Sequence, residues 1–242
     1  MEKVTKKTFL LLLTLFFYMG TVMAQIPVFC GEHKYDGEHK NEVSGYLQVG
    51  TNIITGKFLG PSVSYTRHLT DRISVNAGFD LPFGKGKNGI STSATYRLPA
   101  SYMNFYFSGK LLYNRYVDYK VNEYNANLSA TFETPYFDLT VGETLIRYNM
   151  LGTGYTEPIT FTFGTGVNIR PRWNSWNIGL FLRNYDDFYY ENWNINWGVR
   201  WNANIKKRLK LYGELNIRPA GSTSQLATRY ESSLKVGLKY LW

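Results

Sequence analysis

The residues with the most evident chemical potential in this sequence are charged side chains in its C-terminal third. The basic ones are Arg183, Arg200, Lys210, Arg218, Arg229 and Lys235, and the acidic residues Glu214 and Glu231 lie among them. Basic side chains that line a common passage lower the electrostatic cost of admitting an anion. The same side chains could instead pair with the carboxylates and brace the structure. The choice depends on the elements that carry them.

Catalytic chemistry has little support in the rest of the sequence. A hydrolytic site needs a nucleophile and a base within hydrogen-bond reach. Outside the N-terminal tail the sequence has a single histidine, His68, beside the short turn Leu69-Thr70-Asp71. We therefore predict no catalytic residues, and an enzyme is the least favoured of the functions considered below.

Two further motifs lack the structural context that their chemistry needs. Residues 84–89 have the G-x-G-x-x-G spacing of a dinucleotide-binding loop, but a strand-like run follows where that motif requires a helix. Residues 31–42 repeat Gly-Glu-His-Lys beside Cys30, and zinc or copper could bind there, but no element fixes the geometry. We therefore predict that residues 84–89 form a flexible basic external loop and that residues 31–42 form a solvated tail. We predict that the protein binds neither a metal nor a cofactor.

The first 24 residues have the parts of an export signal. Lys3, Lys6 and Lys7 precede the apolar run 9–19, and Val22-Met23-Ala24 places small residues before a cleavage site. We expect a signal peptide over residues 1–24, a periplasmic tail over 25–42 and the folded domain over 43–242. Cys30 is the only cysteine, so no intrachain disulfide is expected.

From Val43 onward apolar residues alternate with polar ones, which is the pattern of strands with one apolar face. The clearest run interleaves Trp193, Trp197 and Trp201 with asparagines, which are poor helix formers. Twelve such runs follow one another, at residues 43–55, 58–69, 72–82, 90–98, 102–115, 121–133, 136–147, 158–170, 175–185, 190–205, 208–218 and 228–242.

Strand and connection lengths favour a membrane barrel over a soluble sandwich. Most runs span about 9 to 15 residues, whereas strands of soluble proteins commonly have about five or six, and a tilted membrane strand needs about 9 to 11. Short links such as Thr70-Asp71 and Lys206-Lys207 alternate with longer ones at 83–89, 148–157, 186–189 and 219–227. The first external link, Gly56-Lys57, is an exception because it is short. Short periplasmic turns and longer external loops are typical of outer-membrane barrels. We predict an all-β fold, a single twelve-stranded antiparallel transmembrane β-barrel in a Gram-negative outer membrane, with a short N-terminal periplasmic tail.

Aromatic residues mark the expected membrane boundaries. Trp193 and Trp201 lie about 20 Å apart along the membrane normal, close to the separation of two aromatic girdles. The last run places Tyr240 and Trp242 on its apolar face, which resembles the C-terminal signature read by the barrel assembly machinery. We expect these four residues to form the girdle, with that machinery, outer-membrane lipid and lipopolysaccharide as partners. Glu143 falls on the lipid-facing parity, where a charge is costly, and a bulge or an oligomer contact could relieve it.

The same alternation assigns side chains to the lumen. The inward parity is dominated by small or hydrogen-bonding residues such as Thr160, Thr162 and Gly164, so we expect a hydrated lumen. Basic side chains outnumber acidic ones there, which predicts anion preference, with bracing by ion pairs as the alternative. The inward tyrosines or loop tyrosines Tyr106, Tyr185 and Tyr212 could stack on carbohydrate. The basic set is Arg72, Arg97, Lys110, Arg170, Arg183, Arg200, Lys210, Arg218, Arg229, Lys235 and Lys239, against Asp80, Glu123, Glu133, Asp138, Glu214 and Glu231.

A basic, tyrosine-rich, single-chain barrel of twelve strands resembles the small porins for acidic sugars, the oligogalacturonate and sialic-acid channel family. The resemblance covers the architecture of the chain after the signal peptide and its basic lumen. It implies a monomeric channel for anionic oligosaccharides, with arginines such as Arg183, Arg200 and Arg218 along the path.

The leading functional hypothesis is therefore a porin-like outer-membrane channel for passive diffusion of small polar, anionic solutes. The second is a non-conducting structural or surface-interaction barrel, such as a subunit of a secretion or conjugation assembly. The third is an outer-membrane enzyme. No nucleic acid is expected as a partner.

Overall fold

The computed structural model describes residues 40–242 except for 53–55, 82–86, 101, 118, 172–174, 187–188, 191–194 and 221–228. The predicted signal peptide and the predicted tail up to residue 39 lie outside the described residues. Among the residues that are described, no helix is long and apolar enough to cross a membrane.

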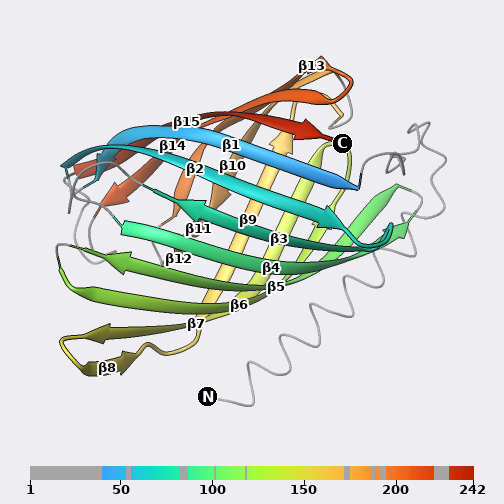
Figure 1. Ribbon diagram of the computed structural model, residues 1–242. Helices are drawn as coiled ribbons and strands as arrows, with labels where there is room; N and C mark the ends of the chain where they lie inside the picture. Colours follow the sequence, from blue (N-terminus) through green and yellow to red (C-terminus); the bar gives the residue numbers. More distant parts are fainter. Residues whose placement is uncertain are drawn as a thin grey trace. The chain divides into compact units, whose positions relative to one another are not determined.

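Every regular element of the described part is a strand (Figure 1). In chain order these are β1 (Asn41–Asn52), β2 (Gly56–His68), β3 (Ile73–Asp80), β4 (Lys87–Ala100), β5 (Met103–Tyr116), β6 (Val121–Glu133), β7 (Phe137–Met150), β8 (Thr153–Thr156), β9 (Thr160–Asn168), β10 (Trp176–Arg183), β11 (Tyr185–Asp186), β12 (Tyr189–Tyr190), β13 (Asn196–Lys206), β14 (Leu209–Ala220) and β15 (Arg229–Leu241).

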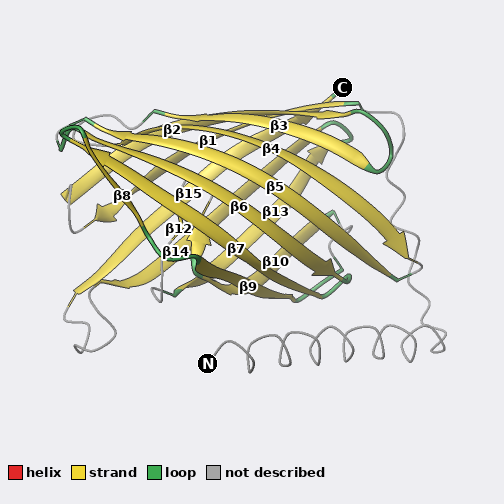
Figure 2. Cartoon of the chain, turned by 90° about the horizontal axis from the view of Figure 1, so that it is seen from below, coloured by secondary structure: helices red, strands yellow, loops and turns green. Residues whose placement is uncertain are grey.

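Thirteen of these strands form one antiparallel sheet that closes on itself. The order is β6-β5-β4-β3-β2-β1-β15-β14-β13-β10-β9-β7-β8, and β6 also pairs with β7. Both β8 and β9 lie along the same edge of β7, where β9 pairs with residues 137–144 and β8 with residues 147–150. They therefore share one position in the wall, which gives the predicted twelve-stranded barrel. Figure 2 shows the strands crossing this wall obliquely, as barrel closure requires.

Burial alternates along the strands as the sequence parity predicts. In β9 the side chains of Thr160 and Thr162 are buried, whereas Phe161 and Val167 are 58% and 57% exposed. A closed barrel with polar side chains inside and exposed apolar side chains outside needs lipid around it. The fold is thus that of an outer-membrane β-barrel.

The external connection predicted over residues 148–157 is wrong. β7 continues to Met150, and the chain reverses at Leu151 and Gly152, whose φ angles of 51° and 85° lie in the left-handed region. β8 then returns along β7 as a short hairpin. Because this hairpin extends the wall beyond the expected apolar band, its sequence lacks the apolar alternation that identifies the other strands.

Several other predicted boundaries also differ from the structure. The strand expected over 175–185 ends at Arg183, and the one expected over 190–205 begins at Asn196. Between them β11 and β12 form a separate two-stranded sheet. The link expected at Gly56-Lys57 belongs to β2, and β4 begins at Lys87, inside the predicted glycine-rich loop. In each case backbone pairing extends beyond or stops short of the alternating residues.

Candidate functional site

The inner wall over β6, β7 and β9 is joined by neutral hydrogen bonds. The Nδ2 atom of Asn127 donates to Thr144 Oγ1 at 2.7 Å and to Thr162 Oγ1 at 3.2 Å. The two threonine hydroxyls are themselves 2.8 Å apart. All three side chains are buried, so these bonds replace the water that burial removes. We call these three residues the amide–hydroxyl ladder.

A buried carboxylate lies nearer the external end of the same wall. Glu123 accepts hydrogen bonds from Asn114 Nδ2 at 2.8 Å, from Asn125 Nδ2 at 2.7 Å and from the Tyr116 hydroxyl at 2.7 Å. Donors to both carboxylate oxygens compensate the desolvation of a buried charge. This glutamate is therefore held by neutral donors from β5 and β6.

The inner wall over β10 and β13 to β15 is joined by ion pairs instead. Arg183 on β10 pairs with Glu214 on β14, and Arg218 pairs with Glu231 on β15. At the periplasmic end Lys239 Nζ lies 2.8 Å from Glu42 Oε1 on β1. These side chains are only partly exposed, so they are screened by salt less than surface pairs are.

Arg200 makes the longest of these connections across the wall. It lies on β13 and pairs with Asp138 on β7, although β10 and β9 lie between those strands. Its guanidinium also donates to Asn168 Oδ1 at 3.3 Å. A Cβ atom at Gly166 would collide with both the Arg200 guanidinium and the Asp138 carboxylate. A glycine on the inner face of β9 thus leaves the room that this pair occupies.

Lys235 points inward from β15 and is only 5% exposed. Its Nζ lies 4.4 Å from the centroid of the Tyr46 ring, within the range of a cation–π interaction. The Tyr46 ring meets Tyr212 of β14 edge-on, with centroids 6.4 Å apart. A cation and two tyrosine rings therefore occupy one side of the lumen together.

Apolar and aromatic side chains meet inside the barrel at one level. Leu112 on β5 and Ile146 on β7 are 3% and 2% exposed, and Tyr46, Tyr148 and Tyr185 pack against them. We call these five residues the lumen cluster. β1, which carries Tyr46, stands opposite β7 in the strand order. The cluster therefore crosses the lumen and narrows it at this level.

Tyr185 enters the lumen from the segment that follows β10. A Cβ atom at Gly164 would collide with the Tyr185 hydroxyl, so this ring lies directly against the inner face of β9.

The predicted lumen residues on β10 and β13 to β15 lie on the inner wall where their side chains are described. Arg183, Arg200 and Arg218, with Glu214 and Glu231, form the pairs given above. Lys235 faces Tyr46, and Lys210 is half-buried near the periplasmic end of β14. The backbone of Arg229 begins β15, but its side chain lies outside the described set.

The predicted girdle residues lie on the outer face where they are described. Tyr240 and Trp242 stack with centroids 5.8 Å apart at the periplasmic end of β15. Trp201 is half-exposed midway along β13, where its ring covers the position that a Cβ atom of Gly213 would take. Trp193 lies outside the described residues. Recognition of the last strand by the assembly machinery stays a prediction.

Some lumen residues were not predicted from the sequence, and one predicted lumen residue lies elsewhere. Glu42 pairs with Lys239, but it precedes the first apolar residue of the alternation. Leu112 and Ile146 interrupt the polar inner parity, and each follows an outward leucine. These adjacent apolar pairs were the available signal for the lumen cluster. Arg170 was expected inside, but its guanidinium lies 3.8 Å from the ring centroid of Trp176, which is on the outer face.

Glu143 is exposed on the outer face, as its parity predicts. It lies in register with Leu128 of β6 and Phe161 of β9, and both pairings of β7 run through it without a shift. The bulge suggested as one way to relieve this charge is therefore wrong. An oligomer contact stays a prediction.

Comparison with solved structures finds outer-membrane barrels of the same architecture. The KdgM porin is 12% identical, with 83% of this chain and 99% of that chain covered and a TM-score of 0.55. The NanC porin is 11% identical, with 83% and 98% covered and a TM-score of 0.54. An outer-membrane channel from Pseudomonas putida F1 is 14% identical, with 89% and 100% covered and a TM-score of 0.54. No family model matches the sequence, and no curated protein matches it.

These similarities define the class of protein at the level of fold. The chain is a twelve-stranded outer-membrane β-barrel, and the predicted architectural resemblance to small porins is confirmed. At such low sequence identity the resemblance extends to the fold alone, because one fold supports many functions. Any function has to be argued from the lumen.

Proposed function

We propose that this barrel is a narrow channel for passive diffusion of small polar solutes, with a preference for anions. The observation that carries the proposal is the inner wall of the closed barrel, where Arg183, Arg200 and Lys235 face the lumen among hydrogen-bonding side chains. Basic groups in a narrow, weakly screened passage favour negative solutes even when carboxylates lie nearby. The porins and the channel of similar fold support a transport role.

Anionic carbohydrate is the solute class that the lumen fits best. Tyr46 and Tyr212 offer an aromatic edge and face, and Lys235 lies directly over the first ring. Sugar rings pack on aromatic faces, while a nearby ammonium group attracts a carboxylate. The lumen cluster would admit such a solute only in an extended, end-on orientation.

The lumen cluster also favours a second candidate, a barrel that does not conduct. Side chains from opposite walls meet there, and the Arg200–Asp138 pair connects strands that are not neighbours. Such contacts can brace a barrel whose role is structural or lies at its surface.

Single-channel recording in planar lipid bilayers separates the two candidates. A channel should give discrete conductance steps, and its reversal potential in a potassium chloride gradient should indicate chloride preference. That preference should weaken at high salt, because the Debye length falls from about 10 Å at 0.1 M to about 3 Å at 1 M. Folded protein that gives no steps would support the structural barrel, and cation preference would contradict the proposed solute class.

A further inference from the structure

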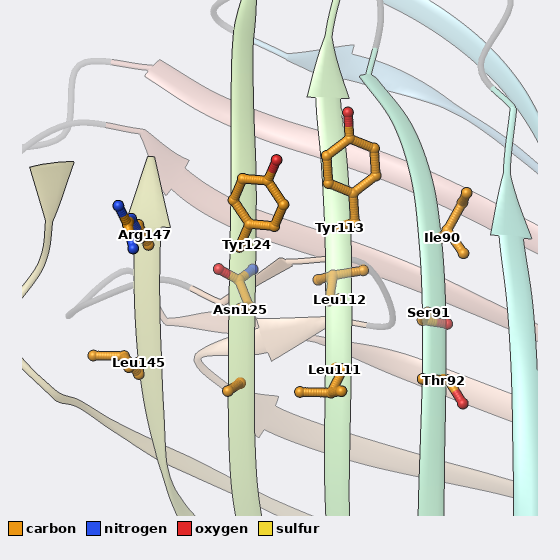
Figure 3. A pocket seen from close by; sticks show the side chains of 11 residues that line it. Ile90, Ser91, Thr92, Leu111, Leu112, Tyr113, Tyr124, Asn125, Leu145 and Arg147 are labelled. Atoms are coloured by element: carbon orange, nitrogen blue, oxygen red, sulfur yellow. The ribbon is translucent and has the colours of Figure 1, made fainter. Parts of the chain in front are cut away.

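The lipid-facing surface carries a hollow on its external half, across β4 to β7. In Figure 3 the upper row of side chains across these strands is Arg147, Tyr124, Tyr113 and Ile90, and the lowest row includes Leu145, Leu111 and Thr92. The hollow has a volume of about 420 Å³. Its outer lining includes Ile90, Leu111, Tyr113, Tyr124, Leu145 and Arg147.

The hollow exists because a small residue stands between two large ones. Ala126 on β6 is in register with Leu111 on β5 and with Leu145 on β7. Both leucines are exposed, so their side chains project on either side of the alanine methyl group. The resulting gap is apolar and open to the membrane, which suits a hydrocarbon chain.

An aromatic pair closes the hollow on its external side. The rings of Tyr113 and Tyr124 have centroids 5.2 Å apart. The Tyr113 hydroxyl donates to Asn122 Oδ1 at 2.9 Å, which fixes the ring near the membrane boundary. Tyrosine at this depth has its apolar ring in the hydrocarbon and its hydroxyl toward the headgroups.

Two arginines stand at the headgroup end of the hollow. Arg147 is in register with Tyr124, and its guanidinium lies beside the position that a Cβ atom of Gly154 would take. Arg115 is two residues beyond Tyr113 on the same outer face, in register with Asn122. Both arginines are exposed, and the residues in register with them are neutral. They place positive charge where an acyl chain in the hollow would carry its polar headgroup.

We propose that this hollow binds lipid A of the outer leaflet, with one acyl chain over Ala126 and a phosphate group on Arg115 and Arg147. Arginine recognises phosphate through paired N–H donors, and the hollow supplies the apolar contact.

A second hollow, nearer the periplasmic end on β1, β14 and β15, provides an internal contrast. Its lining includes Gly45, Leu47 and Leu238 and no charged residue, so it offers a chain-binding surface without a headgroup partner.

Native mass spectrometry of the purified, folded barrel tests the site, with bisphosphorylated lipid A as the probe. The double variant Arg115→Gln/Arg147→Gln should weaken lipid A binding by about ten-fold, because each basic residue near a membrane surface strengthens anionic-lipid binding several-fold. Ala126→Leu should weaken it as well, since the added side chain fills the hollow. Arg67→Gln, an exposed outer-face arginine at the periplasmic end, and Ala130→Leu, on the same face of β6, are the matched controls and should leave binding unchanged.

Two further probes distinguish the sources of phosphate and chain. Dephosphorylated lipid A should bind weakly and respond to Ala126→Leu but not to the arginine changes. Phosphatidylglycerol should bind more weakly than lipid A. Equal loss in the control variants would overturn the site, and phosphatidylglycerol binding that is as tight and as sensitive to the variants would overturn its assignment to lipid A. Heat-modifiable migration on gels establishes that each variant is folded.

Discussion

Along β6, β7 and β9 the inner wall is joined by amides and hydroxyls, whereas along β10 and β13 to β15 it is joined by arginine–carboxylate pairs. Asn127, Thr144 and Thr162 are buried and satisfy one another over short distances. Arg183 and Arg218 keep part of their surface in the lumen. Neutral bonds of the first kind hold strands together without creating a field. We call β6, β7 and β9 the neutral arc and β10 with β13 to β15 the charged arc. The charged arc can also act on a passing solute. We therefore expect the neutral arc to stabilise the wall and the charged arc to set the ion selectivity.

The largest effect is expected in the lumen cluster, where side chains from opposite walls meet. Tyr46→Ala and Tyr185→Ala each remove a ring that packs against Leu112 and Ile146. We expect the single-channel conductance to rise roughly two-fold or more, because the narrowest part of a pore controls its resistance. Tyr106→Ala is a control, since that tyrosine bonds Glu133 and is not in the cluster. Unchanged conductance in both variants would place the ion path elsewhere.

The second test removes the cations of the charged arc. The triple variant Arg183→Gln/Arg200→Gln/Arg218→Gln leaves Asp138, Glu214 and Glu231 facing the lumen without these partners. We expect chloride preference to be lost or reversed in reversal-potential measurements.

Arg67→Gln, on the outer face, should leave the reversal potential unchanged. A triple variant that folds and keeps its chloride preference would assign these arginines to bracing alone.

A smaller effect of opposite sign is expected from Glu214→Gln. This change removes a carboxylate partner of Arg183 and one negative charge from the lumen. Chloride preference should increase, and more so at low salt because the added field is screened as salt rises. The pair variant Arg183→Gln/Glu214→Gln keeps the net charge and should return the reversal potential close to that of the wild type. If both variants behave alike, the two side chains do not act on the permeating ion.

The smallest functional effect is expected in the neutral arc. Thr144→Val keeps the side-chain shape but removes the hydroxyl that bonds Asn127 and Thr162. The free energy of unfolding should fall by about 1 kcal/mol, the typical contribution of a buried hydrogen bond. Selectivity should not change. Urea unfolding in detergent or liposomes measures the free energy of unfolding, and the exposed Thr153→Val is the control. A shift in the reversal potential of Thr144→Val would contradict the assignment of selectivity to the charged arc.

The fold was predictable because membrane strands follow a simple physical rule. Lipid outside and polar side chains inside impose alternation on each strand, and the parity assigned from that rule agrees with burial along β9. β8 was missed because a hairpin beyond the apolar band has no such constraint. Tyr185 was assigned to an inward or loop position, but its contacts with Leu112 and Ile146 were not predicted, because these partners come from distant strands.

The candidate site was predictable as a set of inward positions but not as a set of contacts. Parity assigns both Arg200 and Asp138 to the lumen, but their pairing depends on strand order, on register and on the space at Gly166. Glu42 shows the opposite limit, because it is adjacent to Lys239 only through closure of the first and last strands. Alternation within a strand therefore predicts neither which inward residues contact each other nor which residues become adjacent when the barrel closes.

Closure of the barrel also constrains the order in which it can form. β1 pairs with β15 from Glu42 and Leu241 to Thr51 and Ser232, and backbone hydrogen bonds of 3.0 Å join Asn41 with Trp242 in both directions. One edge of β1 therefore has no partner until the last strand is in place. Unpaired backbone groups are costly in hydrocarbon, and contacts between such distant residues form slowly. We therefore expect insertion to be a single cooperative event that follows association of β15 with β1, rather than a stepwise addition of hairpins.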